Sequence, residues 1–259
     1  MDSQAISEQM QSLLERIRRL EDAYNGGWIS AVEEKWTFDS DDDPTYILTI
    51  PGDLTWKYCV GMRVRLKQAG GTSAYFIITA VDYPDDCTVL TLYGGTDYDL
   101  ADLPIIEPYY STAKAPYGFP LDEEKWTVKV VDSNVYAQAN PVTNQWYNLG
   151  NLSIVVPIGQ WRLKYSFCLT VRRPTGNWVF AHCALSTSTT FASDPELQLG
   201  EGFSPVTDCH LNAAQDMPKT LPSKTVYYLI SRVIVGGETS LEAYGYHQAN
   251  ILKAVCAYL

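Results

Sequence analysis

The apolar residues near the N-terminus follow a helical repeat that disappears from Trp36 onward. They are spaced alternately four and three positions apart: Ile6, Met10, Leu13, Ile17, Leu20 and Tyr24. This spacing is the a/d seam of a coiled coil. Residues 1–25 are therefore predicted to form an oligomerisation and attachment helix, which Gly26 and Gly27 end.

Two features of this seam favour a parallel homotrimer. Leu14 falls at position e and widens the apolar face, which favours three strands over two. Arg16 falls at g and Glu21 at the following e, an attractive pair between parallel helices. The candidate oligomerisation residues are Ile6, Met10, Leu13, Leu14, Ile17 and Leu20. An alternative is an amphipathic helix that packs on its own β-domain, because so short a coil is marginal alone.

A nearly repeated hexapeptide indicates two successive β-domains. EEKWTF at residues 33–38 recurs as EEKWTV at residues 123–128, while the flanking sequences do not repeat. We interpret it as the first strand of each domain. The boundary is expected in residues 115–120, which have the composition of a loop. The predicted domains are residues 26–118 and 119–259.

The first domain is predicted to be a small antiparallel β-barrel. Alternation over residues 62–67 predicts a half-buried strand whose Arg63, Arg65 and Lys67 form a basic, solvated face. Further strands are expected at residues 46–50, 75–81 and 88–93, joined by short turns.

The second domain is predicted to be a β-sandwich, plausibly a jelly roll. Strands are expected at residues 126–131, 152–156, 161–171, 178–185, 226–235, 241–246 and 251–259, the last running to the final residue. Residues 174–177 have the composition of a hairpin turn. This number and spacing of strands is typical of a sandwich.

The charge balance excludes some partners. The chain has 19 Lys and Arg against 30 Asp and Glu, a formal net charge of −11. Nucleic-acid phosphates require a basic surface, so no nucleic-acid partner is expected. No apolar run approaches the length of a membrane span, and the N-terminal residues lack the pattern of a signal peptide. The six cysteines are therefore expected to be reduced thiols in a protein made in the cytosol.

No catalytic or metal-binding motif is found, so we expect neither an enzyme nor a cofactor. The pairs His182-Cys183 and Cys209-His210 each place adjacent residues on opposite faces of a strand, which argues against a shared zinc ion. The acidic run at residues 39–43 lacks the pattern of a calcium loop and is interpreted as a solvated turn. A Ser/His/Asp triad, which is assembled in space, stays open.

Aromatic residues near loops are candidates for carbohydrate binding. Trp178 follows the predicted turn, and Tyr244, Tyr246 and His247 surround Gly245. An aromatic ring can stack on the apolar face of a sugar. Loop anchoring and subunit contact are equally good explanations of these four residues.

Several segments resemble virion structural proteins of tailed bacteriophages that infect Gram-positive bacteria. They are residues 61–68, 75–81, 90–98, 110–111, 116–120, 126–128, 146–150, 156–159, 184–187 and 254–259. The resemblance spans residues 36–259 and implies a homotrimeric, non-enzymatic part of a virion, made in the host cytoplasm. It transfers no site residue.

These observations together predict a trimeric fibre or receptor-binding protein of a virion that attaches to the host surface. The expected partners are other copies of the chain, other virion proteins through the N-terminal helix, and a host cell-wall glycan. One alternative is a head fibre or capsid decoration protein with the same layout. An alternative of another class is a carbohydrate-active enzyme or its binding module.

Overall fold

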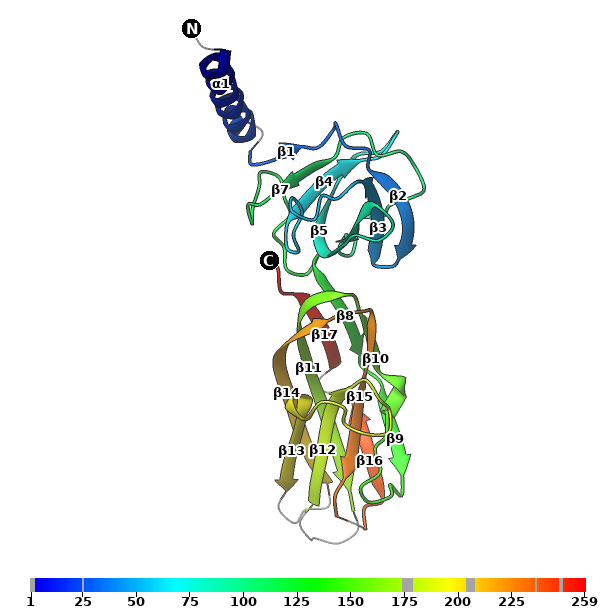
Figure 1. The fold of residues 1–259 in the computed structure, drawn as a ribbon. Coiled ribbons are helices and arrows are strands. Elements are labelled where there is room, and N and C mark those ends of the chain that lie inside the picture. The colour runs from blue at the N-terminus through cyan, green and yellow to red at the C-terminus, as the bar shows by residue number, and fades with distance from the viewer. Residues whose placement is uncertain (1–2, 25, 174–178, 204–207, 236, 247–248) are drawn as a thin grey trace. The chain divides into compact units, whose positions relative to one another are not determined.

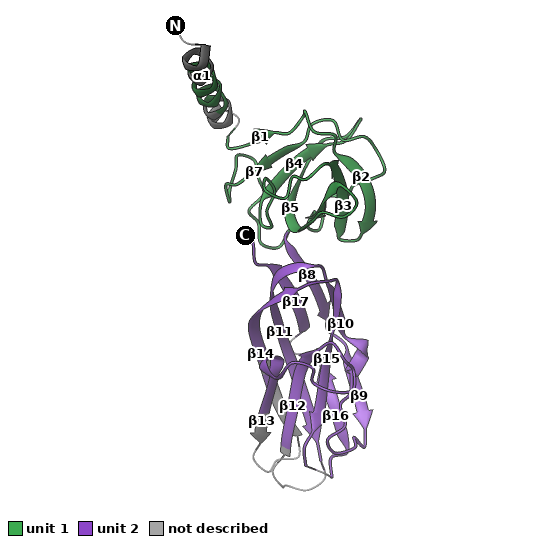
Figure 2. Ribbon diagram, in the orientation of Figure 1, with its two compact units in different colours: residues 1–125, 259 green, residues 126–258 purple. Residues whose placement is uncertain are grey.

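The computed structural model describes residues 3–24, 26–173, 179–203, 208–235, 237–246 and 249–259 (Figure 1). The described chain is mainly antiparallel β-structure with one α-helix, which confirms the predicted class. It divides into two compact units (Figure 2). Unit 1 comprises residues 1–125 and Leu259, and unit 2 comprises residues 126–258. The domain boundaries at 25/26 and 118/119 stay a prediction.

The predicted N-terminal helix is present as α1 (Ser3–Tyr24). Its described apolar side chains are all exposed: Met10, Leu13, Leu14, Ile17 and Leu20. The side chains of Ile6 and Tyr24 lie outside the described residues. Gly26 and Gly27 follow the helix with φ angles of 67° and 90°, the left-handed conformation that commonly ends a helix. The helix is thus confirmed, and its assembly into a coiled coil stays a prediction.

Seven strands of unit 1 form one antiparallel sheet. They are β1 (Ile29–Ser30), β2 (Thr37–Asp42), β3 (Thr45–Pro51), β4 (Arg63–Lys67), β5 (Ser73–Asp82), β6 (Cys87–Tyr93) and β7 (Tyr109–Ser111). The order is β1-β7-β4-β5-β6-β3-β2, and the described strands do not close into a ring. The predicted closed barrel is therefore wrong. Bulges in β2 and β5 bend the sheet, but β1 pairs only with β7 and β2 only with β3.

The predicted solvated face of β4 is wrong at Arg63, whereas Arg65 and Lys67 are half-buried. Arg63 is 1% exposed, and its guanidinium lies 4.9 Å from the ring centre of Phe119. Its Nε donates to the carbonyl of Lys114 at 3.1 Å and its Nη1 to the carbonyl of Gly61 at 2.6 Å. The segment that carries Lys114 and Phe119 covers this face, and alternation within β4 could not reveal that cover.

Unit 2 contains two antiparallel sheets. Its strands are β8 (Thr127–Asp132), β9 (Val135–Ala139), β10 (Ser153–Val156), β11 (Gly159–Arg172), β12 (Val179–Ser186), β13 (Gln198–Phe203), β14 (Asp208–Leu221), β15 (Thr225–Val233), β16 (Ser240–Tyr244) and β17 (Asn250–Cys256). Two short 3-10 helices are η1 (Leu149–Asn151) and η2 (Pro195–Leu197). One sheet has the order β10-β15-β12-β13, and the other β8-β17-β11-β16-β9 with β14 paired to β11.

The long strand β11 organises the larger sheet. β14 pairs along its whole length on one edge. On the other edge β17 pairs with its first half and β16 with its second half. The chain between β16 and β17 approaches β8 and β9 so closely that a Cβ on Gly245 would lie 2.6 Å from the carbonyl oxygen of Asn134. Glycine is required there by this backbone approach.

The inner faces of the two sheets pack against each other. On β11, the buried Trp161, Leu163, Tyr165 and Phe167 alternate with more exposed residues, and every residue from Phe167 to Val171 is buried. The Tyr165 hydroxyl donates to the carbonyl of Leu197 at 3.2 Å, which joins β11 to the segment between β12 and β13. This packing gives unit 2 the layered core of a sandwich.

Most strands expected in the two β regions are present within a few residues of their predicted bounds. The repeated hexapeptide runs into a strand twice, into β2 after the buried Trp36 and into β8 after the buried Trp126. β8 is the first strand of unit 2, but β1 precedes β2 in unit 1, so the prediction of a first strand is wrong there. The final strand ends at Cys256, so the prediction that it runs to the last residue is wrong. The predicted turn at 174–177 lies outside the described residues.

Candidate functional site

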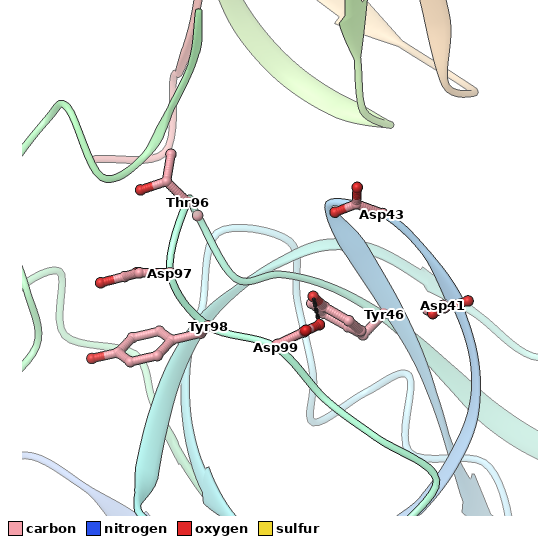
Figure 3. A pocket seen from close by; sticks show the side chains of 8 residues that line it. Asp41, Asp43, Tyr46, Thr96, Asp97, Tyr98 and Asp99 are labelled. Atoms are coloured by element: carbon pink, nitrogen blue, oxygen red, sulfur yellow. Dashed lines mark hydrogen bonds between the residues drawn. The ribbon is translucent and has the colours of Figure 1, made fainter.

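Unit 1 contains an acidic pocket of about 460 Å³ (Figure 3). It is lined by Asp41, Asp43, Tyr46, Gly95, Thr96, Asp97, Tyr98 and Asp99. The first three residues come from β2, β3 and the turn between them, and the others from the segment after β6. β3 pairs with β6, and Thr45 at the start of β3 is opposite Tyr93 at the end of β6. The turn and the segment therefore leave the sheet at the same end of these strands.

Tyr46 joins the two sides of the acidic pocket. Its hydroxyl donates to Oδ1 of Asp99 at 2.6 Å, the contact dashed in Figure 3. Burial of the ring, and then the neighbouring Asp99 carboxylate, raise the pKa of Tyr46 above its ordinary value. The Tyr46 hydroxyl therefore stays protonated and acts as a donor, which leaves carboxylate oxygens as the main acceptors in the pocket.

Lys125 holds the segment that forms the second side of the acidic pocket. The residue is 8% exposed, and its ammonium group lies 3.6 Å from the ring centre of Tyr98. It donates to the carbonyl of Gly94 at 3.0 Å and forms an ion pair with Asp97. Burial lowers the pKa of Lys125 to about 8. A Cβ on Gly95 would lie 2.6 Å from the carbonyl oxygen of Lys125, so glycine permits this close packing.

The chemistry of the acidic pocket suits a ligand rich in hydrogen-bond donors. Carboxylates accept hydrogen bonds from hydroxyl or ammonium groups, and Thr96 can donate or accept. A second hollow of about 320 Å³ shares Asp97, Tyr98 and Asp99 with the first. Among the residues that the structure describes, no group of three or more His, Cys, Asp or Glu side chains is arranged to hold a metal ion.

Sequence reasoning missed this acidic pocket. The run at residues 39–43 was interpreted as a solvated turn, whereas residues 39–42 belong to β2 and only Asp43 lies in the turn. The available signal was the pair of acidic segments at residues 41–43 and 97–99. Nothing in the sequence showed that β3 pairs with β6 and so brings the two segments together.

Two of the four predicted ligand-binding residues lie together in unit 2. Tyr244 is the last residue of β16, and the rings of Tyr244 and Tyr246 are 6.5 Å apart at an angle of 68°. Tyr246 is 75% exposed. Trp178 and His247 lie outside the described residues. The binding role of this pair stays a prediction.

His182 and Cys183 point to opposite faces of β12, as predicted. Cys183 is fully buried, with its sulfur 4.0 Å from the Tyr165 hydroxyl. His182 faces outward, and its Nδ1 lies 2.9 Å from Nε2 of Gln198 and 3.3 Å from a guanidinium nitrogen of Arg232. Since both neighbours are donors, Nδ1 is the acceptor of a neutral imidazole. The side chains of Cys209 and His210 lie outside the described residues.

Comparison with known proteins identifies no family. No family model and no curated protein matches the chain. Among solved structures, the infectious bursal disease virus Gx strain gives a TM-score of 0.26 at 14% identity, covering 87% of this chain and 59% of that chain. The Gt strain gives 0.28 at 11%, covering 85% and 62%. The chain thus spans about three fifths of these viral proteins.

A tandem CBM22 domain of Paenibacillus barcinonensis Xyn10C gives a TM-score of 0.17 at 10% identity, covering 87% of this chain and 92% of that chain. TM-scores of this size establish neither a common fold nor a common function. The described residues include no helix with both the length and the apolar character that a membrane span requires.

Acidification is expected to destabilise unit 2 through His182. Burial, and then the nearby Arg232, lower the pKa of His182 below its ordinary value of 6.5. The unfolded chain then binds this proton more tightly than the folded chain, so stability is lost as the pH falls below about 6.5. We expect His182→Gln to reduce the fall in the urea midpoint between about pH 7.5 and about pH 5.5. An equal fall in wild type and variant would contradict this assignment.

Proposed function

We propose that the chain is a structural protein of a virus particle and assembles as a homotrimer through α1. The observation that carries this proposal is the exposed apolar row on α1, formed by Met10, Leu13, Ile17 and Leu20 with Leu14 beside it. Removing an apolar helix face from water lowers the free energy, so this face favours association with identical helices. The resemblance of residues 61–68 and 75–81 to phage virion proteins supports the assignment of the chain to a virus particle.

We further propose that unit 2 is a jelly roll. β9 continues the path of β8, and β16 that of β17, so the strands form two sets of four: β8-β17-β11-β14 and β10-β15-β12-β13. Successive strands pass between the two sets in the manner of two nested Greek keys. Viral capsid domains and lectins both use this arrangement, which fits display on a particle and fits ligand binding.

Within this proposal, the particle protein is a fibre or receptor-binding protein. Residues 1–25 serve attachment and assembly, residues 26–118 form one domain, and residues 119–259 form the outer domain. The partners are other virion proteins and a host cell-wall glycan. A head fibre or decoration protein has the same layout and differs only in its place on the particle. The exposed Tyr246 beside Tyr244 favours a second candidate, a carbohydrate-binding module, because one aromatic platform suffices for it.

Gold-labelled antibody against the full chain tests the virion assignment. On intact particles whose genome encodes the chain, we expect label at the tail tip or baseplate for a receptor-binding protein. Label over the head would reject the receptor-binding role and favour a head fibre or decoration protein. Particles that carry no label and no peptides of the chain would overturn the virion assignment altogether.

Attachment itself is tested with the purified full chain on host cells. We expect Tyr246→Ala to lower cell binding by about tenfold, because one stacking contact is lost in each of three copies. The matched control is Tyr117→Ala in unit 1, where another tyrosine is 83% exposed. Equal binding by the two variants would remove Tyr246 from the binding surface, and no binding by wild type would overturn the attachment role.

A further inference from the structure

The outer face of the larger sheet of unit 2 carries a row of lysines. Lys164 on β11 is directly opposite Lys253 on β17, and Lys253 is directly opposite Lys129 on β8. The neighbours of Lys164 and Lys253 along their strands, including Leu163 and Leu252, are buried on the inner face. The three lysines therefore stand side by side on the outward face, which we call the lysine row. Figure 1 shows β8, β17 and β11 next to one another.

Arg162 and Asp216 extend the lysine row. Asp216 on β14 is directly opposite Lys164, and its carboxylate lies 3.6 Å from Nζ of Lys164. The same carboxylate binds Nη2 of Arg162 at 2.6 Å. Arg162 points to the same face, one pleat along β11. This stretch of the sheet thus gathers four cationic side chains, of which Arg162 and Lys164 share the Asp216 carboxylate.

The lysine row is unusual in so acidic a chain. The whole chain has 19 Lys and Arg against 30 Asp and Glu, whereas residues 126–258 have nine against eight. Cross-strand neighbours have Cβ atoms about 5 Å apart, and like charges in that position destabilise a sheet. Three lysines in adjacent registers thus concentrate positive charge on this face, which a bound anion would offset.

We propose that the lysine row binds a linear phosphate polymer. Adjacent strands are about 4.8 Å apart, so the row presents positive charges at short, regular steps across the sheet. A linear polyanion presents negative charges at comparably short steps, and each contact releases counterions. The outward face of a sheet can bind such a chain without a cleft. This proposal does not depend on the virion role, because the purified protein alone can be tested.

The test measures binding of the full chain to immobilised inorganic polyphosphate. We expect binding that weakens steeply with salt, and at least about tenfold weaker binding when Lys129, Lys164 and Lys253 are all changed to glutamine. The matched control changes three exposed lysines elsewhere, Lys35, Lys114 and Lys224, to glutamine and so removes the same charge. The control is expected to bind within about twofold of wild type, since those lysines are not part of the row.

Stability separates binding from a structural role. Lys253→Gln removes the middle charge of the row, so it is expected to weaken polyphosphate binding under conditions where the urea midpoint shows the variant to be folded. A lowered midpoint with unchanged binding would show that the row serves the fold and would overturn the proposal.

Three other outcomes would also overturn it. Equal losses in the triple variant and in its control would show attraction by net charge alone. Binding to phosphatidylglycerol vesicles without binding to polyphosphate would indicate a membrane surface as the ligand. A smaller assembly for the triple variant in light scattering would make the face a contact between copies of the chain.

Discussion

Leu13→Asp is expected to convert an assembly of three 29.0-kDa chains into single chains. Leu13 is a central d position of the predicted seam, and its side chain is exposed on the single α1 helix. In a trimer three copies of this leucine would meet in the core, and burying each contributes about 1.5–3 kcal/mol. Three carboxylates in the same place would lose that gain and repel one another. Size-exclusion chromatography with light scattering measures the mass directly.

The control for this prediction is Ser12→Asp, which adds the same charge one residue away at an outward c position. We expect it to keep the mass of wild type, and the β units of both variants to keep the wild-type urea midpoint. A 29.0-kDa mass for the wild-type chain would show that α1 does not assemble. A mass of two chains would support the seam but would reject the argument that Leu14 at position e favours three helices.

The residues that the sequence placed correctly are those whose environment is set by near neighbours. The apolar residues of α1 recur every three or four positions, which predicted the helix. β11 alternates inward Trp161, Leu163 and Tyr165 with outward polar residues. The sequence did not predict β14, although β14 pairs with β11 over 14 residues. Polar residues such as Asn212, Asp216 and Lys219 interrupt any apolar alternation in β14. Its order comes from hydrogen bonds to β11, which the sequence of β14 does not encode.

Sites assembled from distant segments were beyond reach for the same reason. The acidic pocket depends on the pairing of β3 with β6, and the lysine row on the registers of three strands. A shift of one residue in β17 would turn Lys253 to the inner face and abolish the row. Single residues near loops, such as Tyr246, could be found because exposure there needs no register.

Arg63→Met is expected to destabilise unit 1 by about 3 kcal/mol, because a buried charged donor is lost from a network of partners. The methionine keeps much of the side-chain volume but cannot donate to the carbonyls of Lys114 and Gly61 or stack its charge on Phe119. Hydrogen exchange of peptides from β4 and β5, followed by mass spectrometry, measures the stability of unit 1 separately from that of unit 2. A loss of this size corresponds to roughly hundredfold faster exchange of the most protected amides.

Lys67→Met is the matched control, because it removes a cation from the same strand. Lys67 is half-buried and lies 3.6 Å from the Glu107 carboxylate, which is half exposed, so this pair contributes about 0–1 kcal/mol. Arg63→Lys should fall between the two, because an ammonium keeps the charge but cannot reach both carbonyls in the geometry of a guanidinium. If exchange in Arg63→Met matched that in Lys67→Met, the cover over β4 would contribute little, and Arg63 would behave as the surface cation that strand alternation predicted.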